Sequence, residues 1–396
     1  MANVSSSNGL EKRPALSFRD DCGREFPSWH RTTLGTIIEP YSEKVHGEHD
    51  FEVLTSSREG LQRQIDHFGS QQRHDTDGYN IIPLGFCTYR NRSDDGRFTF
   101  NINKISDKAI VSKFYPVFRF KNANSTFMTE YLNSSARARK KLSVLAVGTS
   151  QVVLSFEALK SAKFDLPCKE EQDKIASLLE CLNERVELQR SFVDALKKYK
   201  RGLLSNLFGE KATQEWTTKS YYFSEIAQRR SEKYDPTSGI EYPCVELENI
   251  EQETGKILST VPSTAQSSIK NIAMSGDTLF GKLRPYLRKY AFAQQTMACS
   301  SEIWALIPSN IVLPKFLFYL VQTEQFLRVA NISSGTKMPR AEWSNIEKTE
   351  FFIPDPFVQR KVVSLLEGLD QKITFADSML FCLNRLKASL LQQLFI

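Results

Sequence analysis

Two segments of the chain place apolar residues at alternating four- and three-residue spacings. This pattern extends over nearly five heptads in each segment, which favours two long helices that pack along a partner helix. Each helix would be about 50 Å long at about 1.5 Å per residue. We expect the interface between the helices to include Leu179, Leu182, Val186, Leu366, Leu369 and Ile373. The alternative is a core helix within one large domain, but the matched lysines Lys200 and Lys387 favour a specific pairing of the two segments.

The chain also contains an internal repeat. Pro167 aligns with Pro354, and at this offset of 187 residues Phe164 meets Phe351 and Gln172 meets Gln359. The register continues without a gap to the end of both helical segments, and upstream it places Phe156 on Trp343. The protein therefore consists of two halves, each with a variable globular block followed by a similar helix.

The two globular blocks have the short β-branched and aromatic runs of mixed α/β domains. Residues 117–120 and 301–307 are predicted strands, and residues 314–328 are a predicted single helix. The predicted fold class is thus α+β, with a pseudo-two-fold repeat. The predicted parts are an N-terminal arm (1–25), a first domain (26–165), a central helix (166–209), a second domain (210–353) and a C-terminal helix (354–396).

Composition excludes several classes of protein. The net charge of +6 and the pI of 8.8 fit a nucleic-acid partner without requiring one. The seven cysteines are scattered and form no CxxC pair, so we expect reduced thiols and no metal site. The longest apolar stretch, residues 311–321, is too short to cross a membrane, and the N-terminus does not read as a secretory signal. A cytoplasmic location is expected.

Several segments, in an order repeated in both halves, closely resemble the specificity subunit (HsdS) of type I restriction-modification systems. In the second half the resembling segments are GDTLFGKLRPYLRKYAFA (276–293), SSEIWALIP (300–308), SSGTKMPRAEW (333–343) and FFIPDPFVQRKVVSLLEGLDQKI (351–373). In the first half they are VLTSSREGL (53–61), IIPLGFCTYR (81–90), AVGTSQVVLSFEAL (146–159) and FDLPCKEEQDKIASLLECLNERV (164–186). The resemblance covers almost the whole chain.

This resemblance implies a division of labour. Each domain would read one half of a split target in double-stranded DNA, and an antiparallel coiled coil of the two helices would set the distance between the halves. The implied partners are two modification subunits, which methylate adenine with S-adenosylmethionine, and restriction subunits, which are motor-nucleases that use ATP and Mg. No cofactor is expected in this chain itself.

The sequence offers little support for a catalytic centre. It lacks a GxxxxGK[ST] phosphate loop, and Asp355-Pro356-Phe357 lacks the second proline of an amino-methyltransferase [DN]PP[YF] motif. We therefore predict a non-catalytic subunit that directs methylation and restriction by its partners. Two alternatives stay open: a fused single-chain restriction and methylation enzyme, and a helical scaffold protein that does not touch DNA.

Residues that contact DNA should be Arg, Lys, Asn, Ser or Tyr on loops of the two domains, because phosphates attract cations and base edges accept and donate hydrogen bonds. The candidates in the first domain are Ser57, Arg58, Arg63, Arg90, Asn91 and Arg92. The candidates in the second domain are Lys282, Arg284, Tyr286, Arg288, Lys337 and Arg340. The target sequence and the spacer length do not follow from these residues.

Overall fold

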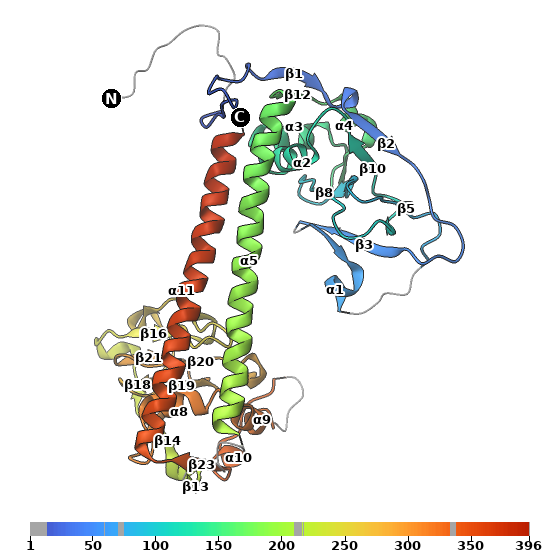
Figure 1. The fold of residues 1–396 in the computed structure, drawn as a ribbon. Coiled ribbons are helices and arrows are strands. Elements are labelled where there is room, and N and C mark those ends of the chain that lie inside the picture. Colours follow the sequence, from blue (N-terminus) through green and yellow to red (C-terminus); the bar gives the residue numbers. More distant parts are fainter. Residues whose placement is uncertain are drawn as a thin grey trace, which may run out of the picture. The chain divides into compact units, whose positions relative to one another are not determined.

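The computed structural model describes residues 14–58, 60–69, 75–209, 216, 218–332 and 338–395. These residues form two compact units, which we call unit 1 (residues 1–189 and 379–396) and unit 2 (residues 190–378). Each unit contains one globular domain and parts of two long helices, α5 (Lys169–Phe208) and α11 (Pro356–Leu394) (Figure 1). The α+β class predicted from the sequence is confirmed.

The domain of unit 1 contains two four-stranded sheets. The first has the order β2 (Ile38–Tyr41), β10 (Val117–Phe120), β6 (Cys87–Tyr89) and β8 (Phe100–Ile102), and all its pairs are antiparallel. The second has the order β4 (Gly60–Arg63), β3 (Glu52–Ser57), β9 (Ala109–Val111) and β5 (Asn80–Ile81). Strands β3 and β9 are parallel, which makes this sheet mixed.

Shorter elements complete unit 1. Two further strand pairs join β1 (His30–Thr33) to β12 (Lys163–Leu166) and β7 (Arg92–Ser93) to β11 (Val152–Val153). The short helices are η1 (Leu34–Thr36), α1 (Gln64–Phe68), α2 (Ser125–Ser134), α3 (Ala136–Leu145) and α4 (Phe156–Ser161). Side chains of Asn124, Ser135 and Ser155 accept hydrogen bonds from the first turns of α2, α3 and α4, which explains where these helices begin.

Unit 2 repeats this architecture. Its antiparallel sheet has the order β14 (Ala227–Arg229), β22 (Ile303–Pro308), β19 (Thr278–Gly281) and β20 (Tyr290–Phe292). Its mixed sheet has the order β15 (Lys233–Tyr234), β18 (Lys270–Ala273), β21 (Met297–Cys299), β16 (Pro243–Val245) and β17 (Val261–Pro262). Strands β16 and β21 are parallel, as β3 and β9 are in unit 1. The duplication seen in the sequence is therefore a duplication of the fold.

One further strand pair and several short helices complete unit 2. Strand β13 (Thr218–Tyr222) pairs with β23 (Glu350–Pro354), as β1 pairs with β12. The α-helices are α7 (Phe223–Ile226), α8 (Pro314–Leu320), α9 (Glu324–Ala330) and α10 (Trp343–Ile346), and the 3-10 helices are η2 (Pro236–Ser238), η3 (Leu247–Asn249), η4 (Ser263–Ala265) and η5 (Pro285–Leu287).

The single helix predicted over residues 314–328 is wrong. The structure has two short helices there, α8 and α9. Helix α9 begins anew because the Thr323 hydroxyl accepts a hydrogen bond from the backbone N–H of Phe326 at 3.3 Å. A threonine with extended backbone at this place ends one helix and caps the next.

The two long helices pack against each other within each unit. In unit 1, Ile175 and Leu179 near the start of α5 share a core with Leu390 and Leu394 near the end of α11. In unit 2, Leu204 near the end of α5 shares a core with Leu366 near the start of α11. The helices are therefore antiparallel at both places. The six predicted interface residues are all buried, with at most 8% exposure, and detailed coiled-coil packing stays a prediction.

The described part of the N-terminal arm contacts the last turns of α11. The Leu16 N–H donates a hydrogen bond to the Gln393 carbonyl oxygen at 3.0 Å, and Leu16 and Phe18 pack against the core of unit 1. The arm thus supplies a donor to a helix end whose carbonyl groups lack partners within the helix. None of the helices in the described ranges is long and apolar enough to span a lipid bilayer.

Candidate nucleic-acid interface

Several of the candidate DNA-contacting residues lie where β6 and β19 end, at equivalent places in the two units. The Leu154 N–H donates to the Asn91 carbonyl oxygen at 2.9 Å, and the Ala341 N–H donates to the Lys282 carbonyl oxygen at 2.8 Å. Residues 154 and 341 are related by the repeat offset of 187. Asn91 and Lys282 therefore occupy the same position of the repeated fold, so the fold presents the same loop twice.

In unit 1 this loop and the hairpin of β3 and β4 enclose a hollow of about 230 Å³. The structure brings together four candidates predicted from the sequence, Ser57, Arg58, Arg90 and Arg92. It adds Arg97, which the sequence analysis missed, from the same loop. Asp94 and Asp95 also line it, so the four arginines outnumber the acids, which suits an anionic ligand.

The arginines of this hollow differ in how strongly they are held. Arg58 donates to Asp95 Oδ2 at 2.6 Å, and Asp95 also accepts a hydrogen bond from the Ser93 hydroxyl. This hydrogen bond from Ser93 is the main cause of the lowered pKa of Asp95. The guanidinium of Arg92 lies 5.0 Å from the centre of the Phe114 ring. Within the described residues, Arg90 and Arg92 have no carboxylate within 4.0 Å, so both could pair with an anionic ligand.

Two candidates of the first domain do not line the hollow. Arg63 lies at the end of β4 and forms an ion pair with Glu52 at 2.6 Å. Asn91 lies in the loop, but its Oδ1 atom is buried and has no hydrogen-bond partner among the described residues. A role of Arg63 and Asn91 in DNA contact stays a prediction.

In unit 2 a hollow of about 590 Å³ lies beside the equivalent loop, at Lys282, and its lining comes mainly from β14 and β22. Lys282 is the one residue of this hollow that the sequence analysis had singled out. The structure adds Gln228, Arg229, Arg230, Ser231, Lys233, Asn271, Ser301, Trp304 and Trp343 to its lining. These residues come from strands far apart in the sequence. The signals that could have pointed to this place are Trp343, the repeat partner of Phe156, and the segment 300–308, which contains Ser301 and Trp304.

Glu302 holds two of the cations near this hollow. Arg340 donates two hydrogen bonds to the Glu302 carboxylate, at 3.0 and 3.2 Å, and these bonds raise the pKa of Arg340. The Lys282 ammonium lies 4.0 Å from the same carboxylate. Arg340 also pairs with Leu283 through a backbone bridge, which places it beside the loop.

The other candidates of the second domain are dispersed. Arg284 and Tyr286 are exposed just after the loop, and Arg284 has left-handed backbone with φ of 51°. Arg288 belongs to a different cavity, where it contacts Glu324 at 2.6 Å and Glu253 at 3.5 Å. The structure therefore does not place Arg288 beside Lys282, and its role in DNA contact stays a prediction. Lys337 lies outside the described residues.

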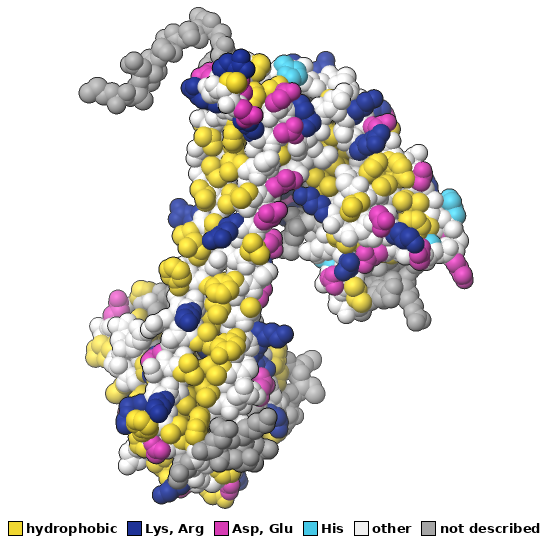
Figure 2. All heavy atoms as spheres, viewed as in Figure 1, with side chains coloured by type: hydrophobic (Ala, Val, Ile, Leu, Met, Phe, Trp, Pro, Cys, Tyr) yellow, Lys and Arg dark blue, Asp and Glu magenta, His cyan; other side chains and the backbone are white. Residues whose placement is uncertain are grey.

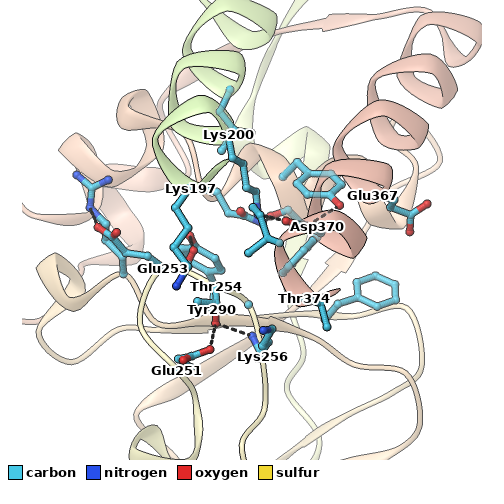
Figure 3. Close-up of a pocket in the computed structure, with 18 of the residues that line it drawn as sticks. Lys197, Lys200, Glu251, Glu253, Thr254, Lys256, Tyr290, Glu367, Asp370 and Thr374 are labelled. Carbon is cyan, nitrogen blue, oxygen red and sulfur yellow. Dashed lines mark hydrogen bonds and ion pairs between the residues drawn. The ribbon is translucent and has the colours of Figure 1, made fainter. Parts of the chain in front are cut away.

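The cavity that Arg288 lines has a volume of about 780 Å³ and lies between the second domain and the helix pair of unit 2 (Figure 3). Lys200 of α5 forms an ion pair with Asp370 of α11 at 2.7 Å, and the Tyr319 hydroxyl of α8 donates to the same carboxylate at 2.9 Å. Across the cavity, Lys256 contacts Asp377 at 3.2 Å. Arg201 of α5 pairs with Glu253 at 3.1 Å, so ion pairs connect this domain to both helices.

The long helices also expose a second apolar face. On α5 it includes Leu188, Phe192 and Tyr199, and on α11 it includes Phe375, Met379 and Leu386, each offset from its counterpart by 187 residues. Exposure reaches 70% at Phe375. Figure 2 shows hydrophobic side chains gathered along the helices on the face in view. The sequence analysis missed this face, although its residues have heptad spacing.

In the described part of the chain, no three His, Cys, Asp or Glu side chains are grouped so that they could hold a metal ion. The buried thiols of Cys87 and Cys299 have pKa values raised to about 12, because burial disfavours their charged form. Neither cysteine is therefore suited to act as a thiolate nucleophile.

Comparison with known proteins shows which family the chain belongs to. The model of the type I restriction modification DNA specificity domain matches residues 49–197 and 223–377. The chain is 27% identical over 198 residues to the type I restriction enzyme HindI specificity subunit of Haemophilus influenzae, a match that covers 45% of this chain and 40% of that protein. It is 23% identical over 253 residues to the EcoDI specificity subunit of Escherichia coli, with 54% and 55% covered. The chain spans about half the length of these relatives.

Two solved structures share the fold. The S subunit of a type I restriction-modification system from M. genitalium superimposes with a TM-score of 0.58 at 17% identity, covering 97% of this chain and 99% of that chain. A chain from a structural study of complex assembly and conformational transition of the type I R-M system gives a TM-score of 0.53 at 16% identity, covering 94% and 98%. At these identities the likeness concerns the fold alone.

Proposed function

The chain belongs to the family of type I restriction modification DNA specificity domains, and from this membership we propose that it is the DNA-reading subunit of a type I restriction-modification enzyme. It binds a target of two half-sites and directs adenine methylation and restriction by its partners. The observation that carries the proposal is the basic hollow found at the end of the same strand, β6 or β19, in both units.

Each hollow suits one half-site. Cations at the rim attract phosphates in a salt-dependent manner, and amide and guanidinium groups hydrogen-bond to base edges. Arg90 and Arg92 serve this purpose in unit 1, and Lys282 with Arg284 serves it in unit 2. We assign recognition to residues 26–165 and 210–353, and spacing to the helices of residues 166–209 and 354–396.

The partners bind the helices. The second apolar face occurs once on α5 and once on α11 at the repeat offset, so it offers two equivalent surfaces to two modification subunits. An exposed apolar stripe with heptad spacing favours an apolar helix of a partner. S-adenosylmethionine, ATP and Mg belong to the modification and restriction subunits, and this chain works in the cytoplasm as a non-catalytic subunit.

A binding experiment tests this function against the alternative of a scaffold that does not touch DNA. The chain is purified with its modification subunit and incubated with a library of random duplexes, and the bound duplexes are sequenced after several rounds of selection. We expect enrichment of two short sequences at a fixed separation, with affinity that falls as salt rises. A complex that assembles but retains no duplex at 50 mM salt would contradict the proposal.

A further inference from the structure

Arg229, which lines the hollow of unit 2, packs its guanidinium against two tryptophan rings. The guanidinium of Arg229, at the end of β14, lies 4.9 Å from the ring centre of Trp343 and 5.8 Å from that of Trp304. Arginine stacks on aromatic faces through its planar group, and tryptophan is the strongest aromatic partner for a cation. The two indoles therefore restrict where this guanidinium lies without using its N–H groups.

The neighbouring cations of the hollow lie beside acidic or amide partners. Arg230 donates to both oxygens of Asp277, at 2.6 and 3.0 Å. Lys233 donates to the Asn271 side chain at 2.6 Å, and Lys282 lies beside Glu302. Within the ranges that the structure describes, Arg229 has no carboxylate within 4.0 Å, and it is exposed. Its N–H edge is thus available to a ligand.

The backbone at Arg229 is also fixed. Arg229 pairs with Leu306 in the β14–β22 ladder, and the Arg230 N–H continues this ladder by donating to the Ala305 carbonyl oxygen at 2.8 Å. The side chains of the Arg230 and Asp277 pair are only 10% and 3% exposed. A buried, two-pronged ion pair one residue away holds the end of this strand, so the backbone at Arg229 does not have to be ordered when a ligand binds.

We propose that Arg229 reads a guanine in the half-site bound by unit 2, through paired hydrogen bonds to the O6 and N7 atoms of the base. This inference rests on the proposed function. A guanidinium whose face is stacked and whose edge is free has the geometry that recognises this base in the major groove. The hollow of about 590 Å³ beside it leaves room for the base edge to approach.

The repeat shows that this reading element belongs to one half-site only. Leu306 pairs with Arg229 in unit 2, and its counterpart Phe118 pairs with Pro40 in unit 1. Proline has no guanidinium and no side-chain donor. We therefore expect a guanine read by Arg229 in the half-site of unit 2. Pro40, at the equivalent position of unit 1, should read no base in the other half-site.

The test is methylation-site sequencing of cells that express the chain with its modification subunit. Three variants are compared with the wild type: Arg229→Ala, Arg229→Lys, which keeps the charge but loses the paired donors, and the control Arg328→Ala, an exposed arginine of α9 in the same unit. We expect both Arg229 variants to lose discrimination for guanine at one position, by about 5- to 150-fold. The other half-site and the control should be unchanged.

Several outcomes would overturn the inference. An unchanged motif in both Arg229 variants would show that another residue reads this base. Weaker methylation of every site, with an unchanged motif and a smaller dependence on salt, would show that Arg229 contacts a phosphate. Thermal melting identifies a variant that fails to fold. If Arg229→Ala fails to fold, the motif methylated with Arg229→Lys tests whether Arg229 reads guanine. If the wild type gives no two-part motif at all, the proposed function fails and not this inference alone.

Discussion

The repeat places two lysines at matched positions of the helix pair, and the structure predicts very different roles for them. Lys200 is 6% exposed, and its ammonium lies 2.7 Å from Asp370. Lys387, its counterpart, has a side chain that is 29% exposed and lies 3.9 Å from Glu130. We therefore predict that Lys200→Met destabilises unit 2 much more than Lys387→Met destabilises unit 1.

The magnitude follows from burial. Removing one partner of a fully buried ion pair costs about 3 to 5 kcal/mol, because the other charge is left without compensation. The side chain of Asp370 is 29% exposed and keeps its hydrogen bond from Tyr319, so we expect about 2 to 3 kcal/mol for Lys200→Met. Burial raises the pKa of Tyr319, so its hydroxyl stays protonated and donates. The pair of Lys387 and Glu130 is longer, at 3.9 Å, and its lysine is more exposed, so it should contribute less than about 1 kcal/mol.

Urea unfolding followed by tryptophan fluorescence measures this difference. Three of the four tryptophans, Trp216, Trp304 and Trp343, lie in unit 2, so the signal reports mainly on that unit. With a slope of about 2 kcal/mol per molar urea, Lys200→Met should lower the midpoint by about 1 M or slightly more. Lys387→Met is the matched control, read from the fluorescence of Trp29 in a chain whose other tryptophans are replaced by phenylalanine.

A double variant tests the physical reason. In Lys200→Met with Asp370→Asn, no uncompensated charge remains beside Tyr319, so part of the lost stability should return. Equal effects of Lys200→Met and Lys387→Met, or a double variant no more stable than Lys200→Met, would refute the reasoning from burial.

Three further predictions concern function. Charge reversal of Arg284, which is exposed beside the loop of unit 2, should weaken DNA binding through the second half-site alone, and methylation-site sequencing that shows a change in the first half instead would contradict separate readers. Inserting four residues after Leu182 adds about 6 Å of helix, so sequencing should show the same half-sites at a changed spacing, or no methylation; full activity at the old spacing would contradict a spacing role for α5. Phe375→Asp, on the second apolar face of α11, should weaken binding of the modification subunit at least tenfold in a pull-down titration and leave melting of the chain unchanged, whereas unaltered binding would place the docking surface elsewhere.

The helices and the repeat were predictable because their signals are long. A heptad pattern over about 40 residues and a constant offset do not depend on knowledge of tertiary contacts. The short strands were harder, because two- to four-residue strands such as β5 and β7 are stabilised by their neighbours in the sheet. The break between α8 and α9 depends on one capping threonine within an apolar run, which periodicity alone does not reveal.

The candidate site was only partly predictable for a related reason. A basic loop such as residues 90–92 is visible in the sequence, but the partners of each cation are not. Arg288 looked like a DNA contact, yet Glu253 and Glu324 meet it from distant segments. Arg229 carried no signal, because Trp304 and Trp343 approach it only after the sheet and α10 have formed. Local composition predicts charge, and the fold decides which charges are free.

The central claim is that this chain reads two separate DNA half-sites on behalf of a methylating partner. Methylation-site sequencing of a host without its own adenine methyltransferases, expressing this chain together with its modification subunit, tests that claim most directly. The account predicts methylated adenine within one motif of two short specific sequences separated by a fixed run of unspecified bases, absent when this chain is omitted. Methylation within a single uninterrupted motif, or methylation that is unchanged without this chain, would contradict it.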